Sequence, residues 1–145
     1  MELDSLYQEV ILDHYKHPQN KGLSPTFTSQ VNHVNISCGD EITLNILLEN
    51  NVVTSLTWDG QGCSISQASV SIMTDLLKGR SLREAEIIAK SFSELMASKG
   101  SSAGDPLVLE DAVAFAGVSK FPSRIKCSLL GWMAFKDVAI QAQSH

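Results

Sequence analysis

The segment EITLNILLENNVVTSLTWDG, residues 41–60, alternates apolar and polar side chains with the period of a β-strand. Apolar residues stand at every second position from Ile42 to Leu48, which predicts a strand with one buried face. Residues 49–51 (ENN) are typical of a tight turn, after which a second strand ends near Trp58. The segment therefore predicts a β-hairpin.

Elements on either side of this hairpin complete the expected fold. Val31 and His33 indicate one more strand, which makes an antiparallel meander of three. Apolar positions recur at helical spacing in five other segments, residues 3–16, 65–77, 82–96, 105–116 and 125–141. Ser81 with Glu84 forms a capping box, and Asp105-Pro106 supplies an N-cap and a first-turn proline. The order predicts an α+β fold with helices packed on one face of a small antiparallel sheet.

Bulk properties limit the class of protein. The 145 residues, of which 43% are hydrophobic and 19% charged, are expected to form one globular domain over residues 1–145. A net charge of -5 does not attract a phosphate backbone, so nucleic acid is not an expected partner. The acidic start resembles no signal peptide, and no apolar run approaches the ~20 residues that cross a bilayer. We expect a cytoplasmic protein that does not bind membranes.

The three cysteines stand where predicted elements begin or end. Cys38 lies between a polar loop and a strand, Cys63 at a strand-to-helix junction, and Cys127 near the start of the last helix. A reducing compartment and an odd count argue against disulfides. A lone cysteine is commonly a small buried apolar residue. Three at element ends can instead converge on one metal ion, with Asp40 on the same side of an extended segment as Cys38.

The donor set indicates the metal. Three thiolates and one carboxylate suit tetrahedral zinc, and the formal charge of such a centre is -2. Arg124 and Lys126, in PSRIKC, are the nearest cations that could hydrogen-bond the thiolates or hold a sulfur-bearing substrate, unless both are solvated charges. No C-x-x-C pair is present, so the spacing is not that of a zinc finger. The histidines are expected to be structural or solvent-facing: His14, His17 and His33.

Four stretches carry a family resemblance: LYQEVILDHYKHPQNKG (6–22), SCGDEITL (37–44), GQGCSISQASVSIMT (60–74) and FPSRIKCSLLGW (121–132). Together they resemble the NifU N-terminal, or IscU-like, family of iron-sulfur cluster assembly proteins. In the family's scaffold branch a histidine precedes the third cysteine, where this chain has Lys126. The interval between Cys63 and Cys127 also looks longer than in that branch. Both departures resemble the SUF-type branch, SufU.

This resemblance implies a zinc-bound sulfur acceptor. Such a protein takes persulfide sulfur from a pyridoxal-phosphate-dependent cysteine desulfurase of the SufS type and relays it to the SUF scaffold complex. By motif, the zinc ligands match Cys38, Asp40, Cys63 and Cys127. Cys38 matches the accepting thiol and Arg124 a basic residue beside the metal. Coordination dampens a thiolate's reactivity, so we expect docking of the desulfurase to release Cys38.

Two other functions remain open at this stage. The same cysteines with Asp40 could hold a nascent [2Fe-2S] cluster, in which case the protein is a scaffold and binds iron. Alternatively, the zinc is structural, and the protein activates the desulfurase without carrying sulfur. Metal content distinguishes a [2Fe-2S] scaffold from a zinc protein. A sulfur adduct on the protein distinguishes a sulfur acceptor from a structural zinc protein.

Overall fold

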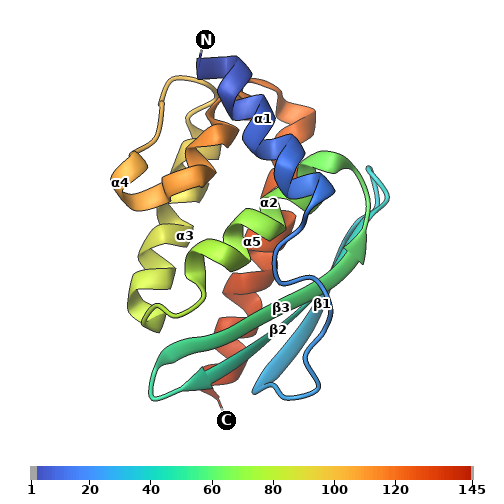
Figure 1. Cartoon of the computed structure of the whole chain (residues 1–145), viewed down its shortest axis with the longest axis vertical. Helices are drawn as coiled ribbons and strands as arrows, with labels where there is room; N and C mark the ends of the chain where they lie inside the picture. The colour runs from blue at the N-terminus through green and yellow to red at the C-terminus, as the bar shows by residue number, and fades with distance from the viewer. Residues whose placement is uncertain (1–2, 145) are drawn as a thin grey trace.

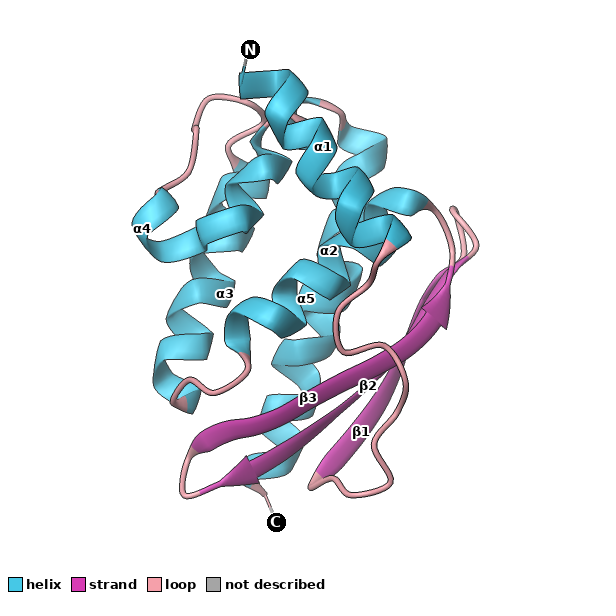
Figure 2. Ribbon diagram, viewed as in Figure 1, coloured by secondary structure: helices cyan, strands magenta, loops and turns pink. Residues whose placement is uncertain are grey.

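A three-stranded sheet and a layer of helices make up the fold of the computed structural model, which describes residues 3–144 (Figures 1 and 2). The strands are β1 (Ser29–Asn35), β2 (Asp40–Glu49) and β3 (Val52–Gln61). The α-helices are α1 (Leu3–Lys16), α2 (Ser64–Leu77), α3 (Leu82–Ala97), α4 (Pro106–Leu109) and α5 (Pro122–Gln143). Two 3-10 helices, Glu110–Ala116 and Val118–Lys120, lead into α5.

The sheet is the predicted antiparallel meander, in the order β1-β2-β3. Asn50 and Asn51 form the β2–β3 turn with φ of 53° and 61°, the left-handed pair that a two-residue hairpin turn requires. Ile42, Leu44 and Ile46 are fully buried on one face of β2. The alternation in residues 41–60 thus marks the core face of the sheet, as predicted.

Helices α2 and α5 cover that face. Helix α5 packs along β1 and β2, whereas α2 packs against α5, α1 and β3 (Figure 2). The loop after α1 bonds the free edge of β3, where the Gly22 N–H donates to the Trp58 carbonyl at 2.7 Å. The predicted α+β class, with helices on one face of the sheet, is confirmed. None of the helices within residues 3–144 is long and apolar enough to cross a membrane.

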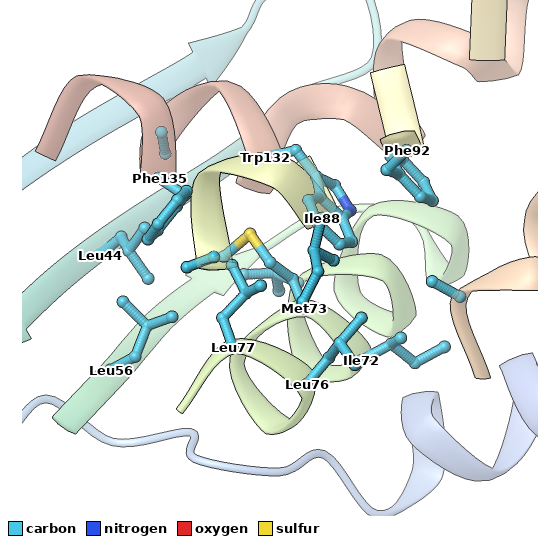
Figure 3. Close-up of a cluster of buried hydrophobic side chains, with 14 of the residues drawn as sticks. Leu44, Leu56, Ile72, Met73, Leu76, Leu77, Ile88, Phe92, Trp132 and Phe135 are labelled. Atoms are coloured by element: carbon cyan, nitrogen blue, oxygen red, sulfur yellow. The ribbon is translucent and has the colours of Figure 1, made fainter. Parts of the chain in front are cut away.

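The contact between α2 and α5 is the centre of the core. Figure 3 shows Trp132 of α5 beside Phe92 of α3, and their rings stack with centroids 4.2 Å apart. A Cβ on Gly131 would lie 2.9 Å from Cβ of Val70, so glycine lets α5 approach α2 this closely. The two helices carry Cys63 and Cys127 near their N-terminal ends, and their packing therefore sets the distance between these thiols.

Two predicted helices differ from the observed ones. The helix predicted over residues 105–116 is α4, which ends at Leu109, followed by a 3-10 helix. Glu110 has a φ of 47°, in the left-handed region, and this interrupts the α-helical hydrogen bonding. Helix α5 begins at Pro122 rather than at residue 125, because a first-turn proline needs no N–H donor. Ser81 caps α3 as predicted, with its hydroxyl accepting from the Glu84 N–H.

Candidate metal and sulfur site

The three thiols gather at one edge of the molecule, where the β1–β2 turn, the start of α2 and the start of α5 meet. Cys38 Sγ and Cys127 Sγ lie 3.0 Å apart. One ligand atom each from Cys38, Asp40 and Cys127 lies within 4.8 Å of the others. Cys63 is outside that mutual set, but its Sγ lies 3.7 Å from Asp40 Oδ2. The structure thus brings the four predicted metal ligands together.

Cys38 lies at the tip of the turn formed by residues 36–39, which projects at the edge of the molecule (Figure 1). Gly39 has a φ of 70°, so the chain reverses between Cys38 and Asp40. The segment is therefore not extended, although the prediction that both side chains lie on one side requires an extended segment. Cys38 is exposed, and so are Val34 and Ile36, which precede it by four and two residues, at 54% and 91%. The site therefore presents one thiol at the surface.

Asp40 is fully buried, and its carboxylate is held by the chain itself. Its Oδ1 accepts a hydrogen bond from the Cys63 backbone N–H at 2.8 Å. A Cβ on Gly62 would lie 2.1 Å from this oxygen, and the φ of Gly62 is 145°. Only glycine fits between Asp40 and Cys63 without a shift. Gly62 is not among the predicted site residues, although a glycine directly before a site cysteine indicates a close backbone approach.

Cys63 is the N-cap residue of α2. Its Sγ accepts from the Ser66 backbone N–H at 3.5 Å, so the thiol takes the place that a serine or aspartate oxygen usually holds. The positive end of the helix dipole and this N–H therefore both face the Cys63 sulfur. The donor to this thiol is the Ser66 backbone, and the Ser66 hydroxyl donates instead to the Cys63 carbonyl at 3.1 Å.

Cys127 is the buried thiol of the three, at 5% exposure on the second turn of α5. Burial, followed by hydrogen bonding with Cys38 and Asp40, raises the pKa of the Cys127 thiol. A divalent cation would offset the charge of thiolates held this close together. Two thiolates on one tetrahedral zinc ion are about 3.8 Å apart, so binding would need the Cys38 and Cys127 sulfurs, now 3.0 Å apart, to separate slightly. The donor set therefore fits a metal ion.

The predicted basic residues lie on the exposed side of α5. Arg124 and Lys126 are both exposed. Arg124 and Ser64, the residue after Cys63, line one hollow of about 770 Å³ between α1, α2 and the start of α5. Among the side chains that the structure describes, those of residues 5–144, no carboxylate forms an ion pair with Arg124. Over the same residues, Lys126 forms no ion pair with Asp40 or any other carboxylate.

The histidines lie outside the site. His14 Nδ1 is 2.8 Å from Ser71 Oγ of α2, in a buried contact between two helices. His33 Nε2 is 2.8 Å from Asp137 Oδ2, which ties β1 to α5. His17 is exposed. The prediction that these residues are structural or solvent-facing is confirmed.

Known proteins resemble this chain over nearly its whole length. The family model described as NifU-like N terminal domain matches residues 6–128. The zinc-dependent sulfurtransferase SufU of Bacillus subtilis is 44% identical over 135 residues, covering 92% of this chain and 89% of that protein. The iron-sulfur cluster assembly scaffold protein IscU of Streptococcus pyogenes is 40% identical over 137 residues, covering 94% and 84%.

A solved structure agrees with the fold. The putative scaffold protein for the SUF system from Fervidobacterium islandicum superposes with a TM-score of 0.84 at 30% identity. The superposition covers 95% of this chain and 99% of that one. The arrangement of sheet and helices is therefore shared along the entire length of that protein.

Proposed function

Because the chain belongs to the family of NifU-like N-terminal domains, we propose that it is a zinc-dependent sulfur acceptor of iron-sulfur cluster assembly. The observation that carries this proposal is that three thiols, one of them the exposed Cys38, lie close to the buried carboxylate of Asp40. The name of the Bacillus subtilis relative combines zinc dependence with sulfur transfer. An exposed thiol in a metal-binding group suits both properties.

Four side chains would hold the metal: Cys38, Asp40, Cys63 and Cys127. Bound zinc keeps coordinated thiols in the thiolate form at neutral pH and balances much of their charge. Asp40 also positions Cys63, because its Oδ1 accepts the Cys63 N–H. The helix N-terminus at Cys63 and the guanidinium of Arg124 add positive potential at this edge.

Cys38 is proposed as the accepting nucleophile because it is the exposed thiol of the three. Its thiolate attacks the outer sulfur of a persulfide on the donor enzyme. The bond between Cys38 Sγ and that sulfur forms as the donor's sulfur–sulfur bond breaks, and the electron pair leaves with the donor's thiolate. The transferred sulfur keeps its oxidation state and its proton, so the step needs no further oxidant or reductant.

A pyridoxal-phosphate-dependent cysteine desulfurase of the SufS type is the proposed donor, and the SUF scaffold complex the proposed recipient. The exposed side chains of Val34 and Ile36 beside Cys38 support protein docking at this edge. Arg124, which forms no ion pair with the described side chains of residues 5–144, is proposed to attract a carboxylate of the partner. We place this exchange in the cytoplasm, where thiols stay reduced.

Transfer of labelled sulfur tests the proposal. The zinc-loaded protein is incubated with a cysteine desulfurase and ³⁵S-cysteine, and the modified peptide is identified by mass spectrometry. We expect one added sulfur on Cys38, none in Cys38→Ser, and an unchanged amount in the matched control Ser37→Ala. Normal labelling of Cys38→Ser would assign the role to another residue. Absence of any adduct on the wild type would instead support a structural zinc protein that activates the desulfurase.

A scaffold for a [2Fe-2S] cluster is the second candidate, and the name of the Streptococcus pyogenes relative favours it. The same thiols would then hold iron and sulfide. Protein purified anaerobically without chelators distinguishes the two functions. Stoichiometric zinc in a colourless protein supports sulfur transfer, whereas iron, acid-labile sulfide and visible absorption support the scaffold.

A further inference from the structure

Two buried amide groups beside the thiols have no hydrogen-bond partner. Among the described side chains, those of residues 5–144, the buried nitrogens without a partner are Asn35 Nδ2 and Gln67 Nε2. A buried donor left unpaired destabilises a fold, so each such group needs an explanation. Both belong to residues next to the thiol edge, and this shared location is the basis of the inference.

The β1–β2 register places the Asn35 amide beside the site. Asn35 pairs with Asp40 across the two strands, and directly paired residues point to the same face of a sheet. Val31 and His33 precede it on this face, where His33 contacts Asp137 of α5. The Asn35 side chain therefore lies on the face that α5 covers, next to Asp40. Its carbonyl also accepts the Cys38 backbone N–H at 3.3 Å.

Helical spacing directs the Gln67 amide to the same site. Gln67 follows Cys63 by four residues on α2, and its backbone N–H donates to the Cys63 carbonyl at 3.2 Å. Side chains on a helix tilt toward its N-terminus and cover the residue four positions earlier. Gln67 is 5% exposed, so its amide is directed along the buried side of α2 toward Cys63.

We infer that the side-chain amides of Asn35 and Gln67 are hydrogen-bond donors for the anionic sulfur of the metal-loaded thiol cluster. This inference rests on the proposed function, since it takes the cluster as a metal-thiolate site. Three thiolates and a carboxylate around a divalent ion carry an excess of negative charge. N–H donors to the thiolates stabilise that charge and orient the sulfurs. The unpaired donors of the metal-free chain thus find acceptors when the site is filled.

Removing a donor should affect the empty and the filled protein in opposite directions. Asn35→Leu and Gln67→Met keep the approximate side-chain size and remove the amide. We expect each to raise the melting midpoint of the metal-free protein by about 2–5 °C, because a buried unpaired donor is gone. Each should also weaken Zn²⁺ binding about tenfold or more, measured by competition with a chromophoric chelator.

The matched control is Asn32→Leu, on the opposite face of β1. The Asn32 amide is already satisfied, since it donates to the side chains of Glu41 and Thr43. This variant should leave Zn²⁺ affinity within about twofold of the wild type and should not raise the melting midpoint. Co²⁺ substitution gives a spectroscopic readout, because thiolates that lose N–H donors move their charge-transfer bands to longer wavelength.

Each result decides the inference. A raised midpoint with weaker Zn²⁺ binding and shifted Co²⁺ bands in both amide variants supports it. Unchanged affinity and bands overturn it, and so does a lowered midpoint with lowered affinity, which would mean that the amides only support the fold. If the wild type itself bound no Zn²⁺ and accepted no sulfur, the proposed function would fail first.

Discussion

Two regions of helices α2 and α5 differ in how their buried polar groups are hydrogen-bonded. One is the contact between the two helices, and the other is the thiol edge at their N-terminal ends. In the contact, Trp132 Nε1 donates to Ser69 Oγ at 3.0 Å, and Ser69 Oγ donates to the Ser128 carbonyl at 2.7 Å. At the thiol edge, the amides of Asn35 and Gln67 have no partner among the described residues. The helix contact satisfies its own buried groups, whereas the thiol edge leaves these two amide donors unmatched.

This difference indicates that the helix contact stabilises the fold, whereas the thiol edge is arranged to bind a ligand. Buried polar groups that pair with one another rigidify a core and fix its packing. Unmatched groups reduce the stability of the empty protein but can interact with a ligand. Substitutions in the two regions should therefore have separable effects on unfolding and on metal binding.

The largest effect on stability is expected from Trp132→Ala in the helix contact. Trp132 is 2% exposed, stacks on Phe92 and satisfies the Ser69 hydroxyl. Its removal should lower the free energy of unfolding by about 3–5 kcal/mol in urea denaturation of the metal-free protein. Cys38→Ser, at the exposed turn, should change it by less than about 0.5 kcal/mol. Similar losses in both variants would contradict the separation of the two regions.

Gly62→Ala should combine a moderate loss of stability with a strong loss of metal affinity. The new Cβ would displace the Asp40 carboxylate, and the residue would be strained at a φ of 145°. We expect about 1–3 kcal/mol less stability and about 10–100-fold weaker Zn²⁺ binding, measured by chelator competition. The matched control is Gly79→Ala, with a φ of 85° and no atom within 4 Å of the new Cβ. Its Zn²⁺ affinity should stay unchanged.

Gly131→Ala tests how the helix contact sets the thiol spacing. The added methyl group meets Val70, and the overpacking should cost about 1–3 kcal/mol in urea denaturation. Adding Val70→Ala removes Cγ2, one of the two nearest atoms, and leaves the Val70 Cβ in place, so the double variant should regain only part of the loss made by Gly131→Ala. A double-mutant cycle measures this coupling. Additive losses would show that the two side chains do not limit the approach of α5 to α2.

The smallest effect is a pH dependence from the His33–Asp137 pair. The hydrogen bond with His33, followed by that from Gln141, holds the pKa of Asp137 below its ordinary value of 3.8. A lowered pKa stabilises the fold above the ordinary value, and this contribution is lost as the pH falls through the lowered one. Asp137→Asn should therefore be slightly less stable than wild type near pH 6, by urea denaturation, with the difference vanishing once the pH has fallen below the lowered pKa of Asp137. A difference that persisted in acid would exclude ionisation of Asp137 as its cause.

Local patterns predicted most of the fold. The bounds of α1 and the β2–β3 turn were correct, because periodicity and the two asparagines act within a few residues. The helix predicted to reach residue 116 was wrong, because Glu110 adopts a left-handed conformation that no local pattern marks. The metal ligands were predicted by counting donors and by family resemblance. Their predicted roles stay predictions until metal binding and sulfur transfer are measured.

The sequence by itself determined where the strands, turns and most helices form, and which side chains can bind a metal. Only the tertiary structure decided that Cys38, Cys63 and Cys127 meet, because they lie on segments far apart in the chain. The packing of α5 on α2 and on the sheet brings these segments together. Tertiary structure also decided that Asn35 and Gln67 are buried without partners, since hydrogen bonding depends on every neighbour that the fold places around a group.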